Sequence, residues 1–329
     1  MATIKDVAKQ TGLGIATVSR YINGGNVREK NRIAIEAAIK KLDFSVNELA
    51  RSLRTDRSRT IGAVIPELNN IFIATILSRV ADIFSQYGYG LIINDCRTNP
   101  EREKDAILFL LDKQVDGIIS MSTNQDGSHL ETVIEKKLPV VLIDRMANKI
   151  QGKVSAVLVD NVKASEEAVQ LLIDAGHSEV GIILGPTNIF TSQQRLLGYQ
   201  QALVKNSLIP NDQLFCFSDY TIKGGYESAK RLLSEGRVTA IFVTNYEMTL
   251  GAMMAINDMH LDIPDDVAFI GFDNMQISQI IKPSLTMVAQ PLDKIADCVA
   301  EIMLDALSGK NASPVIRTLS TEIQLGNSV

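Results

Sequence analysis

Cysteine is scarce in this sequence. The 329 residues include three cysteines, Cys96, Cys216 and Cys298, and none of them lies in a Cys-x-x-Cys pair. An odd number of cysteines excludes a complete disulfide framework, and the lack of paired spacing argues against a zinc site. We therefore expect the three thiols to be buried as small apolar groups, and we predict no metal site.

Long apolar runs are also lacking. No uninterrupted apolar stretch approaches the roughly 18 residues that a membrane span needs, and Met1 to Asp6 lacks the charged-then-apolar pattern of a signal peptide. Hydrophobic residues make up 46% of the chain and charged residues 22%. This composition excludes disorder, and it predicts a soluble cytoplasmic protein of two or three domains without membrane contact.

The motifs of common enzyme classes are missing as well. His129, His177 and His260 lie far apart, and no HExxH, GxSxG or GKS/GKT motif is present. The GLG at residues 12–14 follows no predicted strand and lacks the third glycine of a dinucleotide fingerprint. Asp144 with Asp273 could form a glycosidase carboxylate pair, an alternative that we disfavour. We predict no enzyme, no catalytic residue and no cofactor.

Charge is distributed unevenly along the chain. Residues 1–60 hold 12 basic and 6 acidic residues, whereas the remaining 269 hold 21 basic and 32 acidic residues. A basic amino-terminal module on an acidic body favours contact with a polyanion, because neutralised phosphates release their counterions. An ordinary solvated charged face would give the same count.

The first 44 residues predict a helix-turn-helix. Ile4, Val7 and Ala8 have helical spacing, and Gly12 stands where a C-cap glycine ends a short helix. A second helix follows, in which Val18 and Ile22 can pack on the first. A third helix is predicted over residues 29–42. A small helical bundle for protein contact is the alternative.

The second helix carries side chains suited to DNA. A helix in the major groove presents its amino-terminal residues to base edges, and an arginine there can bind guanine through two hydrogen bonds. Ile15 and Ala16 suit thymine methyls, Arg20 suits guanine, and hydroxyl or amide groups suit phosphates. From this helix, the predicted DNA-binding residues are Ile15, Ala16, Thr17, Ser19, Arg20 and Asn23.

Residues 45–59 form the predicted linker. Leu49, Ala50 and Leu53 have helical spacing, and four arginines lie within residues 51–59. A helix this short is marginal alone in water, so we expect it to fold only on DNA and beside its counterpart in a dimer.

From residue 60 onward, short apolar strands alternate with helices. Runs such as residues 60–66 and 115–120 are rich in Val, Ile and Leu, and the alternation repeats through residues 267–273. This pattern predicts an α/β fold with two doubly wound parallel sheets, whose ligands bind beyond the carboxyl ends of the strands. Helices are predicted over residues 74–87, 101–113, 164–175, 194–206, 224–234 and 249–258.

Polar and aromatic residues recur at the predicted strand ends. Carboxylates and amides accept hydrogen bonds from sugar hydroxyls, arginines donate to them, and aromatic faces pack on sugar C–H groups. Each residue also has a structural explanation, because strand-end Asp often caps a helix and Arg195 could pair with a surface acid. The effector-binding residues predicted in this way are Asn70, Phe72, Asp144, Arg145, Arg195, Tyr220, Asn245, Asp273 and Gln290.

Residues 3–24, TIKDVAKQTGLGIATVSRYING, resemble the amino-terminal signature of the LacI/GalR family of bacterial transcriptional regulators. The similarity continues through EAAIKKLDF and NELARSLRT and extends over essentially the whole chain. It implies a helix-turn-helix headpiece, a hinge helix and a two-lobed effector domain like periplasmic sugar-binding proteins, with crossovers near Asp160, Gln290 and Ser320. The implied boundaries are 1–44 for the headpiece, 45–59 for the hinge, 60–160 plus 290–320 for one lobe, and 161–289 plus 321–329 for the other.

The resemblance also implies roles for further residues. Leu53 matches the wedge that family members insert into the minor groove, which kinks the duplex; a partly exposed linker leucine is the alternative. The predicted DNA-binding set also includes Thr3, Asn47 and Arg51. The effector set resembles a ribose-binding site, and this resemblance adds Ile73 to the predicted effector-binding residues.

Four positions depart from the family pattern. Gly14 replaces the usual capping serine, with a loss of a few tenths of a kcal/mol expected. Val46 replaces a common proline before the hinge asparagine. Ile73 stands in place of a second aromatic residue, which leaves the sugar open. Tyr246 replaces the usual aspartate after the strand, and we expect it to reshape the mouth of the cleft.

The resulting expectation is a homodimeric repressor of a carbohydrate-utilisation operon. Two headpieces would bind a near-palindromic operator, and a small sugar between the lobes would control hinge pairing. A sugar phosphate or a phosphorylated carrier protein as corepressor is the alternative. The segment EIQLGNSV at residues 322–329 carries no leucine heptad, so we expect a dimer rather than a tetramer.

Overall fold

The described part of the chain comprises residues 2–22, 25–44, 57–273, 280–310 and 313–329 of a computed structural model. Its contacts divide the chain into two compact units, Met1–Arg59 and Thr60–Val329. Four predicted DNA-contact residues lie outside the described residues, namely Asn23, Asn47, Arg51 and Leu53.

The first unit begins with a well-capped helix. The Thr3 hydroxyl accepts a hydrogen bond from the Asp6 amide, and the Asp6 carboxylate accepts one from the Thr3 amide at 2.8 Å. This capping box starts the helix, and Gly12 ends it with a φ of 68° that favours glycine. The helices of this unit are α1 (Ile4–Thr11), α2 (Ile15–Ile22) and α3 (Glu29–Leu42).

A small core joins these three helices. Val7 and Ala8 of α1, Val18 of α2, and Ile35 and Ala38 of α3 are buried together. Between α2 and α3, the Tyr21 hydroxyl donates a 2.8 Å hydrogen bond to the Glu36 carboxylate. The helix-turn-helix prediction is confirmed.

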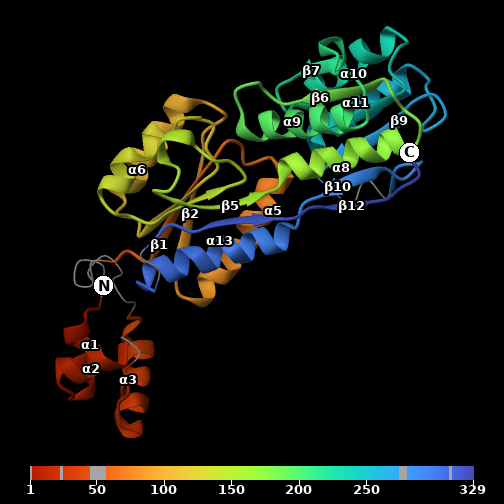
Figure 1. The fold of residues 1–329 in the computed structure, drawn as a ribbon. Coiled ribbons are helices and arrows are strands. Elements are labelled where there is room, and N and C mark those ends of the chain that lie inside the picture. Colours follow the sequence, from red (N-terminus) through yellow and green to blue (C-terminus); the bar gives the residue numbers. More distant parts are fainter. Residues whose placement is uncertain (1, 23–24, 45–56, 274–279, 311–312) are drawn as a thin grey trace. The chain divides into compact units, whose positions relative to one another are not determined.

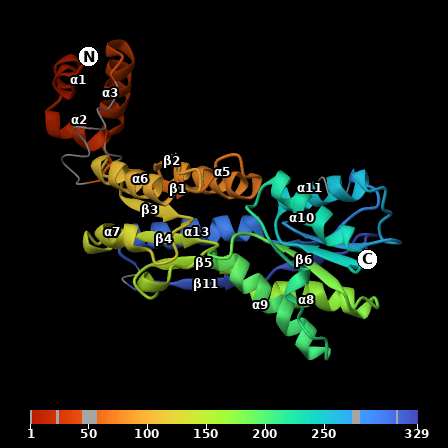
Figure 2. The same ribbon diagram turned by 90° about the horizontal axis from the view of Figure 1, so that it is seen from above.

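The second unit contains two six-stranded sheets, seen in Figures 1 and 2 as two lobes. The sheet of the amino-terminal lobe comprises β1 (Thr60–Ile65), β2 (Gly90–Asp95), β3 (Gly117–Ser120), β4 (Val140–Ile143), β5 (Ser155–Val159) and β11 (Ile316–Leu319). The sheet of the carboxy-terminal lobe comprises β6 (Val180–Leu184), β7 (Phe215–Phe217), β8 (Ala240–Val243), β9 (Ala268–Phe272), β10 (Thr286–Ala289) and β12 (Glu322–Gln324).

The strands are parallel with one exception. The order is β11-β5-β4-β3-β1-β2 in the amino-terminal lobe and β12-β10-β9-β8-β6-β7 in the carboxy-terminal lobe. Only the edge strand β12 pairs antiparallel, with β10, among the strands described. The chain passes between the sheets after β5, after β10 and after β11. The predicted doubly wound fold is confirmed.

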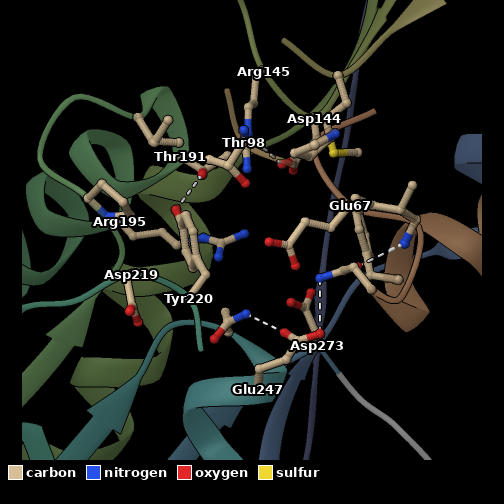
Figure 3. A pocket seen from close by; sticks show the side chains of 18 of the residues that line it. Glu67, Thr98, Asp144, Arg145, Thr191, Arg195, Asp219, Tyr220, Glu247 and Asp273 are labelled. Carbon is tan, nitrogen blue, oxygen red and sulfur yellow. Dashed lines mark hydrogen bonds and ion pairs between the residues drawn. The ribbon is translucent and has the colours of Figure 1, made fainter. Parts of the chain in front are cut away.

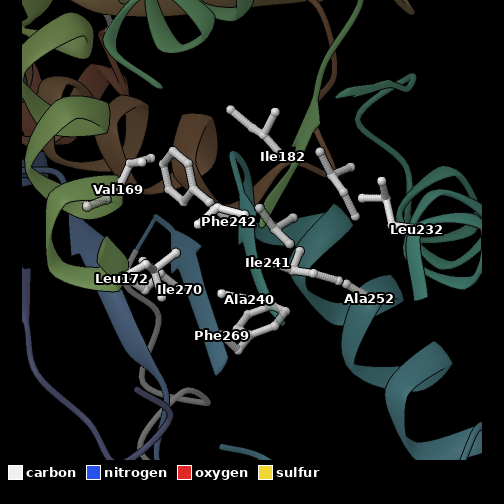
Figure 4. Packing of buried hydrophobic residues seen from close by; sticks show 14 of the residues in the cluster. Val169, Leu172, Ile182, Leu232, Ala240, Ile241, Phe242, Ala252, Phe269 and Ile270 are labelled. Atoms are coloured by element: carbon white, nitrogen blue, oxygen red, sulfur yellow. The ribbon is translucent and has the colours of Figure 1, made fainter. Parts of the chain in front are cut away.

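Helices cover both faces of each sheet. They are α5 (Ile71–Gln86), α6 (Pro100–Asp112), α7 (Glu131–Glu135) and α13 (Leu292–Leu307) in the amino-terminal lobe, and α8 (Asn161–Asp174), α9 (Phe190–Lys205), α10 (Ile222–Ser234) and α11 (Tyr246–Asp258) in the carboxy-terminal lobe. Figure 4 shows successive β8 residues serving opposite faces. Phe242 faces Val169 of α8, whereas Ile241 faces Ala252 of α11.

Several details differ from the sequence predictions. Helices α5, α8 and α11 begin three residues earlier than predicted, because polar residues at 70, 160 and 245 cap them. Cys96 and Cys216 are buried as predicted, but Cys298 is half-buried, and its sulfur accepts a 3.5 Å hydrogen bond from Arg317. No helix in the described ranges is long and apolar enough to cross a membrane.

Candidate functional site

A cavity of about 90 Å³ lies between the two lobes, beyond the carboxyl ends of strands from both sheets (Figure 3). All ten residues predicted to bind the effector line the cavity. The residues that sequence reasoning missed there are Pro66, Glu67, Thr98, Met121, Pro186, Ile189, Thr191, Asp219 and Glu247.

Two of the predicted asparagines cap helices while lining the cavity. Asn70 accepts from the Ile73 amide at 3.0 Å, and Asn245 accepts from the Met248 amide at 2.8 Å. Their side-chain NH2 groups are directed to Glu247, with Asn70 at 3.0 Å and Asn245 at 2.5 Å. The Asn70–Glu247 hydrogen bond therefore joins the two lobes across the cavity.

Arg195 is fixed inside the carboxy-terminal lobe. Its side chain donates to Asn161 at 2.8 Å and to the Thr244 carbonyl, and its guanidinium carbon lies 3.8 Å from the centre of the Phe272 ring. Only 4% of Arg195 is exposed. The alternative that Arg195 pairs with an acid on the surface is therefore wrong.

On the amino-terminal lobe, Asp144 and Arg145 leave atoms without hydrogen bonds. Arg145 Nε lies 3.8 Å from the Asp144 carboxylate, too far for a hydrogen bond. Among the described groups, Asp144 Oδ1, Arg145 Nε and Gln290 Oε1 are buried without a hydrogen-bond partner. The NH2 group of Gln290 donates to Asp273 at 2.5 Å. Two acceptors and one donor are thus left for a ligand.

The position of Tyr220 is fixed by contacts of its hydroxyl and by the close approach of its ring to Gly185. The hydroxyl is within 2.7 Å of the Ser192 hydroxyl and 3.1 Å of the Thr191 hydroxyl. A Cβ at Gly185 would lie 2.0 Å from the Tyr220 ring, so this approach requires glycine. Tyr220, Asp144 and Asp273 have φ values of 64°, 65° and 67°, a conformation that costs energy and is concentrated at functional sites.

Burial and nearby negative charges raise the pKa values of two carboxyl groups in the cavity, those of Glu247 and Asp273. Burial, together with repulsion from Asp273 and Glu67, raises the pKa of Glu247 to about 7. Burial also raises the pKa of Asp273 to about 6, against the attraction of Arg195. The cavity thus favours the protonated forms of these acids more than water does.

The effect of Tyr246 on the mouth of the cleft stays a prediction. Tyr246 is absent from the lining, and the following residue, Glu247, lines the cavity instead. Glu67, Thr98 and Met121 follow strands β1, β2 and β3, so the strand-end rule applied to every loop would have found them. Glu247 lies inside the first turn of α11, where that rule gives no signal.

The predicted DNA-contact residues of α2 differ in how far they are exposed to solvent. Ile15, Ala16 and Arg20 are exposed, whereas Thr17 and Ser19 are half-buried. Arg20 makes no side-chain hydrogen bond or ion pair with the described residues. Thr3 is exposed at the start of α1, but its hydroxyl donates to Asp6 at 2.7 Å. Its hydroxyl hydrogen is therefore engaged in the capping box.

Comparison with known proteins identifies the family. A family model described as bacterial regulatory proteins, lacI family, matches residues 3–47, and one for a periplasmic binding protein-like domain matches residues 169–329. Catabolite control protein A of Priestia megaterium is 34% identical over 99% of this chain and 98% of its own. The chain belongs to the LacI family.

Further LacI-family members agree over most of the chain. The HTH-type transcriptional repressor PurR of Klebsiella pneumoniae (strain 342) is 32% identical over 94% of this chain and 92% of its own. A complex of the transcriptional regulator CelR with cellobiose is 28% identical, with a TM-score of 0.78 and full coverage of both chains. The lac repressor dimer bound to operator and the anti-inducer ONPF shares the fold, with a TM-score of 0.88 at 24% identity over 99% of this chain and 98% of that one. This LacI-family chain is a DNA-binding transcriptional regulator, not an enzyme.

Proposed function

We propose that this regulator is a homodimeric repressor of carbohydrate-utilisation genes, controlled by a small sugar bound between the two lobes. The observation that carries the proposal is the cavity, because ten residues selected for sugar chemistry line it together. The similarity to CelR, whose structure is a complex with cellobiose, supports a carbohydrate as the effector.

Operator binding is assigned to the headpiece. The exposed Arg20 reads a guanine, Ile15 and Ala16 contact thymine methyls, and Thr17 and Ser19 contact phosphates. Thr3 acts through the start of α1, which its capping box fixes. For the hinge we retain Asn47, Arg51 and the wedge Leu53 as DNA contacts, and for the end of α2 we retain Asn23.

The effector acts by binding the two lobes together. The Asn70–Glu247 hydrogen bond already links the lobes, and a ligand that satisfies Asp144, Arg145 and Gln290 adds contacts on both sides. A ligand shifts an equilibrium only by its difference in affinity for the two states. Closure changes the spacing of the two hinges in the dimer and so the affinity for a near-palindromic operator.

A sugar phosphate is the less favoured effector for this cavity. Glu67, Asp144, Glu247 and Asp273 surround it, and Arg195 is already hydrogen-bonded to the protein. A dianion would be repelled by these carboxylates. A phosphorylated carrier protein would bind elsewhere and would leave the cavity to a different ligand.

A thermal-shift scan of the full chain against pentoses, hexoses, disaccharides and their phosphates tests the proposal. A ligand at 100 times its dissociation constant stabilises the folded state by about 2.7 kcal/mol. We expect one monosaccharide to shift the melting of the effector unit and to change operator binding. A shift with sugar phosphates alone, or binding that survives Arg145→Ala unchanged, would contradict it.

A further inference from the structure

Five acidic residues line the cavity and come from both lobes. Glu67 and Asp144 belong to the amino-terminal lobe, and Asp219, Glu247 and Asp273 to the carboxy-terminal lobe. The Asp219 carboxylate accepts hydrogen bonds from the amide and the hydroxyl of Thr221 at 3.0 and 2.7 Å. Figure 3 shows the Glu67 carboxylate pointing into the cavity, on the side where Glu247 and Asp273 lie. The two lobes therefore present negative groups to one another.

The cationic side chains of the lining do not neutralise these carboxylates. Arg195 donates to Asn161 and Thr244 and stacks on Phe272, so it is committed to the carboxy-terminal lobe. Arg145 is 3.8 Å from Asp144 and is directed to the Ser122 carbonyl at 3.4 Å. With Asp144 paired loosely to Arg145, Arg195 is the remaining cation among the described residues that line the cavity.

Repulsion among these carboxylates raises the pKa values of Glu247 and Asp273. Asp273 and Glu67 both raise the pKa of Glu247, and Asp144 raises that of Asp273. These effects add to burial, which acts in the same direction. A positive charge placed among Glu67, Glu247 and Asp273 would relieve both the burial of charge and the repulsion.

Buried atoms without partners show that the cavity is built for a ligand. Asp144 is 8% exposed and Gln290 9% exposed, and each has an oxygen with no hydrogen-bond partner among the described groups. Both atoms are acceptors, so the ligand supplies donors to them. Arg145 Nε, the unpartnered donor, suits one hydroxyl or ring oxygen.

An organic cation fits this cavity better than a metal ion. In the described ranges, no three His, Cys, Asp or Glu side chains are grouped closely enough to hold a metal. The aromatic sides of Phe72 and Tyr220 also line the cavity and suit the C–H surface of a ring. A ring that carries hydroxyls and one ammonium matches all of these groups.

We propose that the effector is an amino sugar, whose protonated amine lies between the lobes among Glu67, Glu247 and Asp273 while its hydroxyls bind Asp144, Gln290 and Arg145. This inference rests on the proposed sugar-controlled function and narrows its ligand class. The ammonium donates three hydrogen bonds to carboxylates of both lobes. It thereby converts repulsion between the lobes into attraction and favours closure.

Calorimetric titration of the full chain at pH 6.5 tests the inference. Glucosamine, galactosamine and mannosamine are each compared with the parent hexose and the N-acetyl derivative, and 1,4-diaminobutane serves as an amine without a sugar ring. We expect one amino sugar to bind about ten-fold or more tightly than its neutral counterparts. Glu67→Gln and Glu247→Gln should reduce this preference, which is measured as the ratio of the amino sugar's affinity to that of its parent hexose in the same variant. Glu227→Gln, which removes an exposed acid outside the cavity, should leave it unchanged.

The outcomes separate the amine from the sugar. Equal or tighter binding of a neutral hexose or an N-acetyl derivative would overturn the amine and leave the sugar-controlled function standing. Binding of 1,4-diaminobutane with no binding of any sugar would overturn the sugar and retain the cationic ligand. A complete lack of binding by the panel would overturn both. An amine preference that survives both Glu→Gln variants would remove these carboxylates from its recognition.

Discussion

The headpiece and the effector unit place the side chains that we propose for DNA and effector binding in opposite environments. On α2, Arg20, Ile15 and Ala16 are exposed and take no part in the small core around Val18. In the cavity, Arg195 is buried and hydrogen-bonded, and the asparagines at 70 and 245 cap helices. Specificity for DNA can therefore change without loss of fold, whereas specificity for the effector is tied to stability.

The largest effect that this comparison predicts is the loss of a buried arginine. Arg195→Ala leaves Asn161 and the Thr244 carbonyl without their donor and exposes a gap beside Phe272. We expect a loss of about 3 to 5 kcal/mol in the stability of the effector unit, together with loss of effector binding. Thermal and urea unfolding of the full chain measure it.

Arg79→Ala is the matched control for that prediction. Arg79 pairs with Asp297 at 2.7 Å on the surface, with 44% of its side chain exposed. A surface pair contributes about 0 to 1 kcal/mol, so the control should unfold almost like the parent. Equal losses of stability in the two variants would contradict a larger contribution of the buried Arg195 to stability.

The second prediction concerns the exposed arginine of α2. Arg20→Ala should weaken operator binding by about 1 to 3 kcal/mol and relax the preference at one base pair of each half-site. The melting of the headpiece should not change, because Arg20 lies outside its core. Competition binding with operator variants measures the preference, and Arg20→Lys, which keeps the charge without the two-pronged geometry, should also lose it. Unchanged base preference in both variants would exclude Arg20 from readout.

A third, smaller effect separates capping from ligand contact at one residue. Asn245→Ala removes both the cap of α11 and the hydrogen bond to Glu247, and it should cost about 1 kcal/mol of stability. Asn245→Ser retains a capping oxygen, so its stability should stay near that of the parent while effector binding falls in both variants. Unfolding measures the stability of each variant, and titration with the sugar measures its effector binding. Together these two measurements separate capping from ligand contact. Full effector binding by Asn245→Ser would show that the residue only caps.

The last prediction concerns the pH dependence of the stability of the effector unit without added sugar. The folded state raises the pKa of Glu247 from its usual 4.5 to about 7, so this group favours folding at acidic pH and loses that contribution as pH rises from about 4.5 to 7. Glu247→Gln should therefore be more stable than the parent at pH 8, by about 1 to 2 kcal/mol after solvent screening. Melting curves between pH 5 and 8 measure the difference. The same pH slope in the parent and the variant would contradict the assignment.

The fold could be predicted largely from apolar periodicity. Runs such as residues 60–65 and 240–243 are continuously buried strands, and the spacing of Val7, Val18 and Ile35 reflects one core. The edge strands β11 and β12 gave no such signal, because exposed and half-buried residues alternate over only three or four positions. The predicted starts of α5, α8 and α11 lie three residues after the observed ones, because the capping residues precede the apolar pattern.

The cavity could be predicted only where a strand end marked it. Asp144, Tyr220 and Asp273 were found because they follow predicted strands. Glu247 was missed, because it reaches the cavity from inside a helix and interacts with Asn70, 177 residues away in the sequence. A contact of that kind depends on the position of one lobe against the other, which local sequence does not encode.

The most direct test of the central claim is operator affinity of the full chain, measured by fluorescence anisotropy with and without the sugar found by titration. The account predicts that the sugar changes operator affinity in the parent, and that Arg145→Ala binds operator normally but does not respond. Arg145 lines the cavity and has no part in the headpiece. A sugar response that persists in Arg145→Ala, or a sugar that binds the parent without changing operator affinity, would contradict control of DNA binding through this cavity.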